Sequence, residues 1–417
     1  MVPDQRRQAV LDRAQGEARL PSVVGAAFAE GRLTWSGIAG AAGAVDAQYR
    51  IGSITKTLTA VLLLQCRDDG LLDLDDPLGE HLPEAGYGDA PLRSLLGHSS
   101  GMQAEPVGPW WERNPGGPAA DLLAANDGSG QVLAPGSAFH YSNLGFGFLG
   151  EVVARLRGAS WASLVSERLL APLGMTRTTY LEAGEHAQGY SVGHFDGTLT
   201  REPHADTGAM APAGQLWSTL DDLARWLDFL ATGHPSILAA STLAEMRDPA
   251  PFADYGLGLR RLAVGECTYV GHTGSMPGFL ATAFVDPVSR TGVVALSNAT
   301  TGVSTDRLAG ALIAGADPYD GETWSPSVQV PERVRELLGL WFWGNTAHEV
   351  RWTNQLLELR TLAPAELADR FVVEPDRIRG VEGYLLGETM HVERDQDGVP
   401  AALECATFRF TRTPYST

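Results

Sequence analysis

The chain has 417 residues, of which 44% are hydrophobic, and it carries a formal net charge of −19. This length exceeds what one hydrophobic core usually organises, so we expect one large domain and a smaller one. The acidic balance disfavours nucleic acid and anionic membrane surfaces as partners, because both are negatively charged. The sequence shows neither an apolar leader in residues 1–20 nor 18 consecutive apolar residues, and this predicts a cytoplasmic protein with no membrane partner.

The first half of the chain predicts the start of a sheet followed by helices. Residues 22–38 have the pattern of a hairpin of two antiparallel strands. Residues 53–67 form an apolar stretch long enough for a buried helix that begins at Ser53. Three further segments have the periodicity of helices: 144–157, 161–170 and 218–233.

Strand patterns return in the second half and end near Asn298, before a helix predicted at residues 304–314. The first strands of the sheet thus lie early in the chain and its last strands late, which predicts an α/β domain over residues 1–314. We expect an antiparallel sheet flanked by helices, with an all-helical subdomain inserted between its strands. Residues 315–331 are rich in proline and polar residues and predict a linker. Residues 332–417 contain short strands at regular spacing, which predicts a small all-β barrel.

Lys56 is the only lysine among the 31 lysines and arginines of the chain. Arginine cannot lose its proton in a protein whereas lysine can, so chemistry that needs a neutral amine would keep lysine at this position. Ser53 lies three residues earlier, and residues at this spacing share one face of a helix. The unpaired N–H groups and positive dipole end at a helix N-terminus favour a developing oxyanion. A neutral Lys56 could therefore take the proton of Ser53 and make it the nucleophile of an acyl transfer.

Two other short motifs carry polar groups that suit a shared site. Tyr141 and Asn143 are two residues apart in an extended segment, so their side chains point the same way. The run His272-Thr273-Gly274-Ser275 ends a predicted strand, where small residues let a substrate backbone lie along the strand edge.

In this order, the segments SITK, YSN and HTG resemble the three motifs of serine penicillin-recognising enzymes, whose first and third motifs are S-x-x-K and K-T-G. Neighbouring segments such as LLAPLGMTRTTY and PAGQLWSTLDDLARWLDFL resemble the group of class C β-lactamases, D-alanyl-D-alanine peptidases and family VIII esterases. Thioesterases of the penicillin-binding-protein type share the same three motifs with this group. The resemblance covers residues 5–314. The C-terminal stretch with GLWFWG resembles the lipocalin-like barrel appended to some of these enzymes.

The resemblance implies a role for each motif residue. Ser53 is acylated, and Lys56 and Tyr141 move its proton. Asn143 holds the substrate amide, and the backbone N–H groups of Ser53 and Ser275 form the oxyanion hole. The substrate lies against the third motif, which consists of His272, Thr273, Gly274 and Ser275. No metal or other cofactor takes part in this chemistry.

His272 departs from the lysine that class C β-lactamases carry at this position, which argues against efficient β-lactamase activity. We expect His272 to bind the acyl donor and not to transfer a proton, because Lys56 and Tyr141 already serve that purpose. An unperturbed imidazole loses its charge above about pH 6.5, so donors with a free carboxylate should bind less well as the pH rises.

Two other motif matches are interpreted as coincidental. Residues 97–101, GHSSG, match the G-x-S-x-G nucleophile elbow, but a helix and not a strand is predicted before them. Residues 145–150, GFGFLG, match a dinucleotide-binding fingerprint, but no strand precedes them and close helix packing explains the glycines better. The cysteines form no disulfide framework or zinc-ligand spacing: Cys66, Cys267 and Cys405. Four histidines are expected in loops or a cleft and not as ligands: His98, His140, His194 and His204.

The sequence thus predicts a serine acyl-enzyme hydrolase or acyltransferase of the esterase, amidase or D-residue peptidase type, working through an ester on Ser53. The partner would be a small-molecule or peptide acyl donor, and this donor could contain a D-residue. An alternative is a stand-alone thioesterase and macrocyclase that releases nonribosomal peptides from a carrier-protein-bound thioester. A third interpretation is an inactive binding protein on the same scaffold, which the intact Ser53, Lys56 and Tyr141 disfavour.

Overall fold

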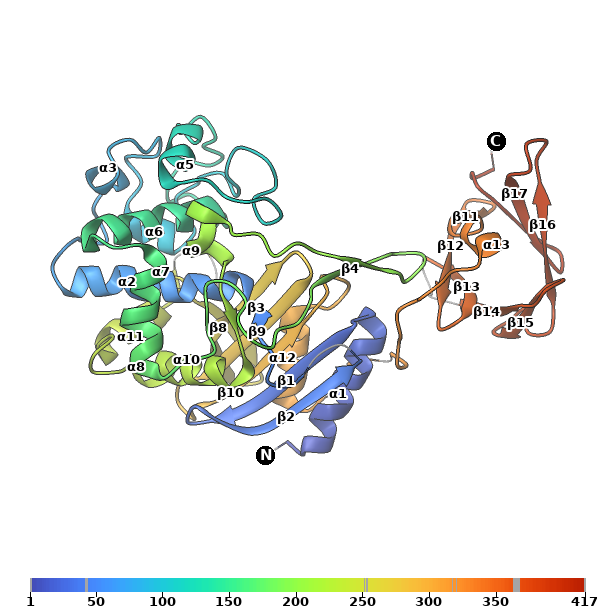
Figure 1. The fold of residues 1–417 in the computed structure, drawn as a ribbon, viewed down its shortest axis with the longest axis horizontal. Helices are drawn as coiled ribbons and strands as arrows, with labels where there is room; N and C mark the ends of the chain where they lie inside the picture. Colours follow the sequence, from blue (N-terminus) through green and yellow to red (C-terminus); the bar gives the residue numbers. More distant parts are fainter. Residues whose placement is uncertain are drawn as a thin grey trace. The chain divides into compact units, whose positions relative to one another are not determined.

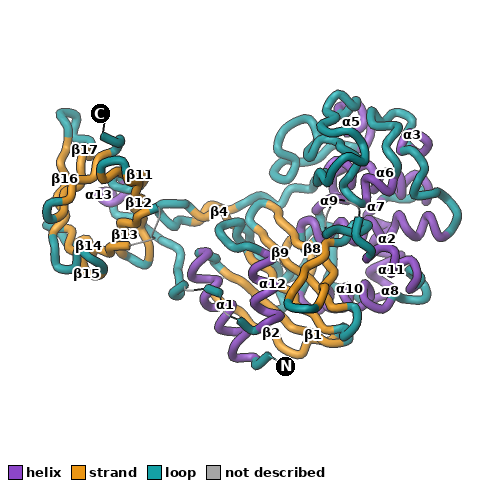
Figure 2. The backbone as a smooth tube through the Cα atoms, turned by 180° about the vertical axis from the view of Figure 1, so that it is seen from behind, coloured by secondary structure: helices purple, strands orange, loops and turns teal. Residues whose placement is uncertain are grey.

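The chain forms two compact units in the computed structural model (Figures 1 and 2). The described residues are 2–41, 44–250, 252, 254–316, 318–319, 321–362 and 368–415. The first unit consists of Met1–Tyr190 and Arg201–Glu322, and the second of Ser191–Thr200 and Thr323–Thr417. Among the described helices, none combines the length and the apolar character that crossing a membrane requires.

A six-stranded sheet with the order β2-β1-β10-β9-β8-β7 forms the centre of the first unit, and all its neighbouring strands are antiparallel. The strands are β1 (Ser22–Ala29), β2 (Arg32–Gly40), β7 (Arg260–Val264), β8 (Cys267–Met276), β9 (Phe279–Asp286) and β10 (Thr291–Ser297). Early and late strands pair directly, with Val24 of β1 opposite Leu296 of β10. The predicted antiparallel sheet is confirmed.

Both faces of this sheet carry helices. Those in contact with it include α1 (Asp4–Ala18), α10 (Leu220–Thr232) and α12 (Thr305–Ala314). Gly25 of β1 faces α1, since a Cβ at this position would lie 3.1 Å from the side chain of Leu11. Val24 and Ala26 point the opposite way and join the hydrophobic core that includes Leu227 of α10. Successive side chains of β1 point to opposite faces of the sheet, and both faces are covered. This is why β1 is buried on both sides and almost wholly apolar.

The other helices of the first unit lie between β2 and β7 in the sequence. The helices nearest to Ser53 are α2 (Thr55–Asp68), α6 (Asn143–Arg157) and α9 (Ala211–Gly214), which contact one another. The shorter helical segments are α3 (Leu78–His81), α4 (Leu92–Leu96), α5 (Ala119–Ala125), α7 (Trp161–Val165), the π-helical turn η2 (Ser166–Leu170), α8 (Ala171–Leu173), the 3₁₀ turn η3 (Gly208–Met210) and α11 (Ala240–Arg247). The helix predicted to begin at Ser53 begins at Thr55, and Ser53 lies in the 3₁₀ turn η1 (Gly52–Ile54) that leads into it.

The second unit contains a closed barrel of eight antiparallel strands, seen as a ring in Figure 2. Its strands are β11 (Gly339–Trp343), β12 (Thr346–Thr353), β13 (Leu356–Thr361), β14 (Ala368–Val373), β15 (Ile378–Glu382), β16 (Thr389–Arg394), β17 (Pro400–Cys405) and β18 (Phe408–Thr411), after the short helix α13 (Glu332–Arg335). Pairing of Phe342 with Thr411 closes the ring. Large apolar side chains such as Trp341, Phe371 and Leu403 form its core. The predicted all-β barrel is confirmed.

One segment of the second unit comes from the middle of the chain. Strands β4 (Tyr190–Val192) and β5 (Leu199–Arg201) form a hairpin whose residues Ser191–Thr200 belong to the barrel unit. The backbone N–H of Trp352 donates to the carbonyl of Phe195 at 2.7 Å, and that of Ser327 donates to the carbonyl of Gly197 at 3.0 Å. No pattern in residues 191–200 predicted that this segment belongs to the second unit.

Candidate active site

Ser53 occupies the turn η1, which contacts strand β8. Gly52 has a φ of +52°, and a Cβ on it would lie 2.5 Å from the backbone nitrogen of Ser275. A Cβ on Gly274 would lie 1.9 Å from the carbonyl oxygen of Ile51. Only glycine fits at these two positions, and their lack of side chains brings the backbone N–H groups of Ser53 and Ser275 to one place.

Lys56 is fully buried and donates three hydrogen bonds. Its Nζ lies 2.8 Å from Oγ of Ser53, 2.6 Å from Oδ1 of Asn143 and 2.7 Å from the carbonyl oxygen of Ala213. These contacts place the amine beside the hydroxyl from which a general base would take a proton. The spacing of Ser53 and Lys56 therefore has the geometric consequence expected from the sequence.

The surroundings of Lys56 also set its charge. Burial lowers the pKa of Lys56 to about 7, although the carboxylates of Glu105 and Glu112 act in the opposite direction. About half of the amine is therefore neutral at pH 7, so the group can accept a proton under ordinary conditions. The rings of Tyr141 and Phe146 lie 5.0 Å and 5.6 Å from Nζ and stabilise the cation that proton uptake produces.

Tyr141 is a proton donor and not a phenolate in this environment. Burial raises the pKa of Tyr141 well above its usual value, while a hydrogen bond with Ser53 and the charge of Arg260 offset this only in part. Its ring lies 4.1 Å from that of His98, centroid to centroid, which fixes its position. The phenol can therefore deliver a proton to a leaving group near Ser53.

Asn143 begins helix α6 because Ser142 caps it, accepting a hydrogen bond from the backbone N–H of Gly145. While its Oδ1 accepts from Lys56, its Nδ2 donates to Oε1 of Glu105 at 2.7 Å. These two bonds fix the orientation of the amide, and the second N–H of Nδ2 remains for a substrate carbonyl. Tyr141 and Asn143 thus lie on the same side of their segment, beside Lys56, as their spacing predicted.

His272 lies on β8 in a chain of buried hydrogen bonds. The backbone N–H of Ser142 donates to Nδ1 of His98 at 3.1 Å, so Nε2 of His98 carries the proton and faces Oη of Tyr255 at 3.2 Å. Tyr255 then donates to Nε2 of His272 at 3.0 Å, and Nδ1 of His272 donates to the carbonyl of Thr273 at 2.5 Å. Each nitrogen of the His272 ring therefore has a protein partner.

The expectation that His272 reads the substrate through a titrating charge does not fit this geometry. Burial lowers the pKa of His272 to about 3, against a weaker opposing effect of its bond to Thr273. The imidazole is therefore neutral throughout the physiological range, and no ring N–H is left for a carboxylate. The sequence could not show this, because Tyr255 and His98 come from other segments of the chain.

Arg260 is a cation next to the third motif. It lies on β7 and lines the same cavity as Ser53 and Thr273. Its guanidinium donates to Oγ1 of Thr273 at 2.8 Å and forms a forked pair with Asp306, with distances of 3.0 Å and 2.8 Å. This residue was not predicted from the sequence, where its only signal is the Arg260-Arg261 pair on the strand before the third motif.

The edge of β8 beside Ser53 is open to a substrate. Gly271 is the last β8 residue paired with β7, so within the described chain the stretch from His272 to Met276 lies beyond that pairing. The adjoining cavity has a volume of about 640 Å³. It contains Ser53, Tyr141, Asn143, the four residues of the third motif, and also Glu112, Phe139, Asp254, Tyr255, Arg260 and Arg261. The structure thus brings seven of the eight predicted site residues to one cavity, with Lys56 buried directly behind Ser53.

The two coincidental motifs do not build a site. Helix α4 precedes residues 97–101, so GHSSG lacks the strand that a nucleophile elbow needs. In the GFGFLG segment, a Cβ on Gly150 would lie 2.1 Å from Cγ of Pro212, and one on Gly147 would lie 2.9 Å from Sδ of Met210. Close packing therefore explains these glycines, as predicted.

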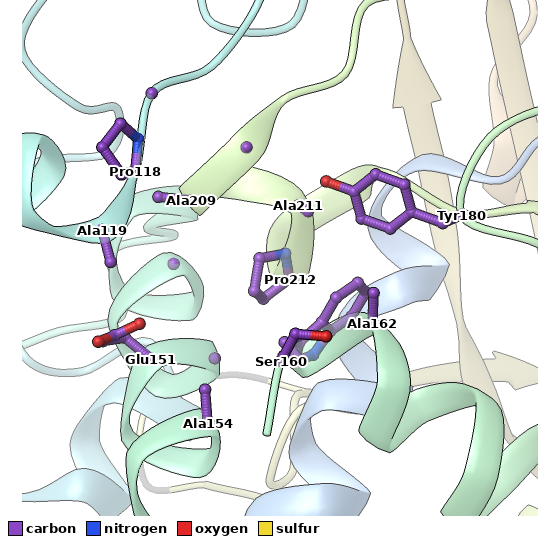
Figure 3. A pocket seen from close by; sticks show the side chains of 15 residues that line it. Pro118, Ala119, Glu151, Ala154, Ser160, Ala162, Tyr180, Ala209, Ala211 and Pro212 are labelled. Carbon is purple, nitrogen blue, oxygen red and sulfur yellow. The ribbon is translucent and has the colours of Figure 1, made fainter. Parts of the chain in front are cut away.

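A smaller cavity of about 300 Å³ lies beside Gly147 and Gly150. It is lined mainly by glycine, alanine and proline, with Tyr180 at its side (Figure 3).

An antiparallel sheet flanked by helices, with a serine at the entrance of a central helix and a buried lysine beside it, is the architecture of penicillin-recognising serine hydrolases. The chain belongs to the beta-lactamase family, whose model matches residues 7–317. A second model, a domain of unknown function (DUF7586), matches residues 330–412. The family resemblance inferred from the three motifs is confirmed.

Curated relatives match parts of the chain. Beta-lactamase-like protein 2 of Dictyostelium discoideum is 30% identical over 225 residues, which are 51% of this chain and 41% of that protein. The D-alanyl-D-alanine-carboxypeptidase/endopeptidase AmpH of Escherichia coli (strain K12) is 30% identical over 199 residues, covering 44% of this chain and 49% of AmpH. The match thus spans less than half the length of each of these two relatives.

Solved structures share the fold over longer stretches. A D-stereospecific amidohydrolase from Streptomyces sp. has a TM-score of 0.66 and 26% identity, covering 75% of this chain and 99% of its own. The D-amino acid amidase from Ochrobactrum anthropi SV3 has a TM-score of 0.61 and 26% identity, covering 75% and 98%. An octameric penicillin-binding protein homologue from Pyrococcus abyssi has a TM-score of 0.68 at 20% identity, covering 98% and 99%, and this likeness concerns the fold alone.

Proposed function

We propose that the protein is a serine amidohydrolase that cleaves an amide or ester at the carbonyl of a D-amino-acid residue, through an acyl ester on Ser53. The observation that carries this proposal is the buried amine of Lys56, 2.8 Å from Oγ of Ser53. Burial that lowers the pKa of Lys56 to about 7 provides the base at the pH where such an enzyme works. A lysine in a purely structural role would have no need to be desolvated beside a nucleophile.

In the acylation step, neutral Lys56 takes the proton of Ser53 while Oγ bonds to the carbonyl carbon of the donor. The resulting oxyanion accepts hydrogen bonds from the backbone N–H groups of Ser53 and Ser275, each worth about 3 kcal/mol in the transition state. When the tetrahedral intermediate collapses, the bond to the leaving group breaks. The proton returns to that group from Lys56 through the phenol of Tyr141.

Deacylation repeats these steps with water as the nucleophile. Lys56, neutral again, takes a proton from the water as its oxygen bonds to the acyl carbon. The bond between that carbon and Oγ of Ser53 then breaks, and Ser53 recovers a proton from Lys56. The acid product leaves and the enzyme is restored, so no oxidant, reductant or cofactor enters the balance.

The cavity gives the donor two further points of recognition. Asn143 offers its remaining N–H to the donor's amide carbonyl, and the free edge of β8 offers main-chain groups along the donor's backbone. Arg260 supplies a permanent positive charge next to Thr273, which suits an anionic group on the donor. We therefore assign to Arg260 the charge recognition first expected of His272, while the neutral His272 holds the strand in place.

Two relatives that are 26% identical over three quarters of this chain support a D-residue donor. Their titles describe a D-stereospecific amidohydrolase and a D-amino acid amidase. AmpH is likewise described as a D-alanyl-D-alanine carboxypeptidase and endopeptidase. The interpretation as a thioesterase and macrocyclase that takes a carrier-bound thioester stays a prediction. Such an enzyme would have the same three motifs as an amidohydrolase, so the motifs do not distinguish the two.

The test compares D- and L-aminoacyl amides and p-nitroanilides of the same side chain. We expect the wild-type protein to release amine from the D-series with a kcat/KM at least tenfold above that for the L-series. Intact-mass spectrometry should detect an acyl adduct on Ser53, and Ser53→Ala should show neither adduct nor turnover. Equal rates for both series would contradict the D-residue assignment, and absence of any adduct with an activated ester or a penicillin would favour the inactive binding protein.

A further inference from the structure

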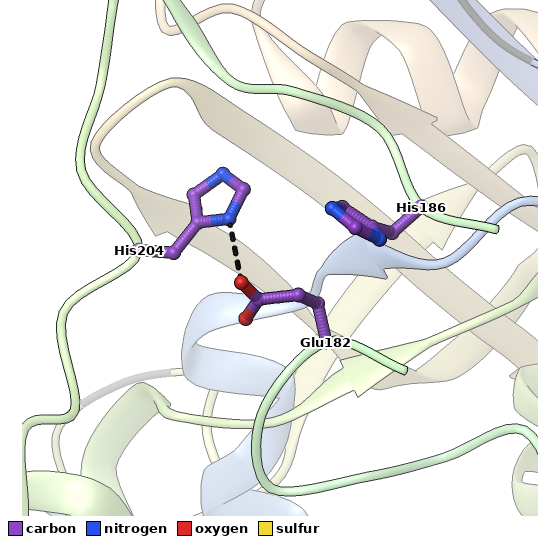
Figure 4. Close-up of side chains that lie close together, drawn as sticks. All are labelled: Glu182, His186 and His204. Atoms are coloured by element: carbon purple, nitrogen blue, oxygen red, sulfur yellow. Dashed lines mark hydrogen bonds and ion pairs between the residues drawn. The ribbon is translucent and has the colours of Figure 1, made fainter. Parts of the chain in front are cut away.

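Three side chains that commonly bind metals lie together in the first unit, outside the cavity that contains Ser53. Glu182 and His186 stand on the loop before β4, and His204 stands between β5 and η3 (Figure 4). Oε1 of Glu182 is 3.2 Å from Nδ1 of His204. One ligand atom of each residue lies within 4.8 Å of the other two. Two imidazoles and one carboxylate are a donor set typical of zinc.

The ring of His186 has the orientation of a metal ligand. Its Nδ1 lies 2.9 Å from the carbonyl oxygen of Gly184, so Nδ1 carries the proton and Nε2 keeps a lone pair. Zinc-binding histidines typically donate their second ring N–H to a carbonyl or carboxylate in this manner. On His204, the nitrogen that faces Glu182 is Nδ1, so this atom would be its zinc ligand.

The backbone around the cluster is held firmly in place. The side-chain carbonyl of Gln48 accepts from the N–H of Ala183 at 2.7 Å, and the backbone N–H of Gln48 donates to the carbonyl of Glu185 at 2.9 Å. Gln48 directly precedes β3 (Tyr49–Arg50), the short strand that leads to η1. On the other side, the ring of His204 packs edge-on against Trp217 at a centroid distance of 4.7 Å. The loop and the half-buried imidazole of His204 thus have fixed supports.

We propose that Glu182, His186 and His204 bind one zinc ion, with water as a fourth ligand. Tetrahedral zinc with bonds of about 2.0 Å needs ligand atoms about 3.3 Å apart. The pair Glu182 and His204 already meets this distance. The ligand atom of His186 lies within 4.8 Å of the other two, and because this residue is exposed a small shift can close the remaining distance without disturbing the core. The ion would join the loop before β4 to the segment before η3, and so stabilise the folded unit.

The test uses the full chain, stripped of metal by a chelator and titrated with zinc chloride by calorimetry. We expect one equivalent of zinc to bind the wild-type protein and to raise its Tm. His186→Ala and Glu182→Gln should each weaken zinc binding at least tenfold. His391→Ala, which removes an exposed histidine on β16 of the barrel, is the matched control and should bind zinc as the wild type does.

Ser53 labelling by an activated ester shows that each variant is folded. Wild-type protein that binds no stoichiometric zinc would overturn the proposal. Zinc binding that His186→Ala and Glu182→Gln leave unchanged would overturn it as well, since the ion would then lie elsewhere. A loss confined to these two variants, with Ser53 labelling retained, would establish the site.

Discussion

The pH dependence of Ser53 acylation tests the assignment of Lys56 as the base. Burial lowers the pKa of Lys56 to about 7. The acylating form is the one with a neutral amine, so the rate should rise as the pH passes upward through this value. A neutral activated ester such as p-nitrophenyl acetate isolates this effect, because its binding requires no charge on the donor.

The size of the effect follows from the titration of one group. With a pKa of about 7, roughly one tenth of Lys56 is neutral at pH 6, one half at pH 7 and nine tenths at pH 8. The acylation rate should therefore increase about tenfold from pH 6 to pH 8 and level off above. Glu112→Gln removes a carboxylate that raises the pKa of Lys56, so its profile should shift to lower pH.

The assay is the pre-steady-state burst of p-nitrophenol, corrected with Ser53→Ala for spontaneous hydrolysis. Asp254→Asn is the matched control, because Asp254 lines the same cavity but is not among the groups that act on Lys56. Its profile should coincide with that of the wild type. Lys56→Arg should abolish the burst, because a guanidinium cannot lose its proton. A wild-type rate that is constant from pH 6 to pH 8 would refute the role of Lys56 as the titrating base.

Three further outcomes follow from the geometry. Arg260→Ala should raise KM at least tenfold for donors with a free carboxylate and change it less than threefold for neutral esters; equal effects on both would show that Arg260 only supports the strand. Gly274→Ala should slow acylation about a hundredfold, as expected for loss of one oxyanion donor, whereas Gly310→Ala, where a Cβ meets nothing within 4 Å, should leave the rate unchanged. A chain that ends at Glu322 should keep Ser53 labelling. It should become sensitive to proteases in the hairpin 191–200, because the barrel partners of that hairpin are gone. Loss of labelling would instead show that the barrel is part of the catalytic fold.

The geometry of the site was predictable where it depends on residue type and short spacing. Ser53 and Lys56 are one helical turn apart, and Tyr141 and Asn143 share one side of an extended segment. Such relations are set by local geometry, which the sequence determines directly. The sheet was predictable for a similar reason, since apolar strands such as β1 must be covered on both faces.

The parts that sequence analysis missed depend on contacts between distant segments. The role proposed for Arg260 depends on its contacts with Asp306 and Thr273, and nothing in the local sequence distinguishes it from other arginines on strands. The titrating charge expected on His272 does not fit the buried ring, because desolvation depends on what the fold places around it. The hairpin 191–200 and its barrel partners are more than a hundred residues apart, so no local pattern links them.

The site combines two cations of different chemistry, and this division has a kinetic consequence. Arg260 is held by Asp306 and Thr273 and, as an arginine, cannot serve as a base, whereas Lys56 is buried behind Ser53 and has a pKa of about 7. Donor binding and proton transfer should therefore respond to pH separately. For a donor with a free carboxylate, KM should stay within about twofold between pH 6 and pH 8 while kcat rises about tenfold, provided that acylation limits turnover. If the charge of His272 bound the donor, KM would instead climb over this range, because the imidazole would lose its proton. A pH-dependent KM that His272→Ala abolishes would thus restore the role first expected of this residue and contradict its neutral state in the structure.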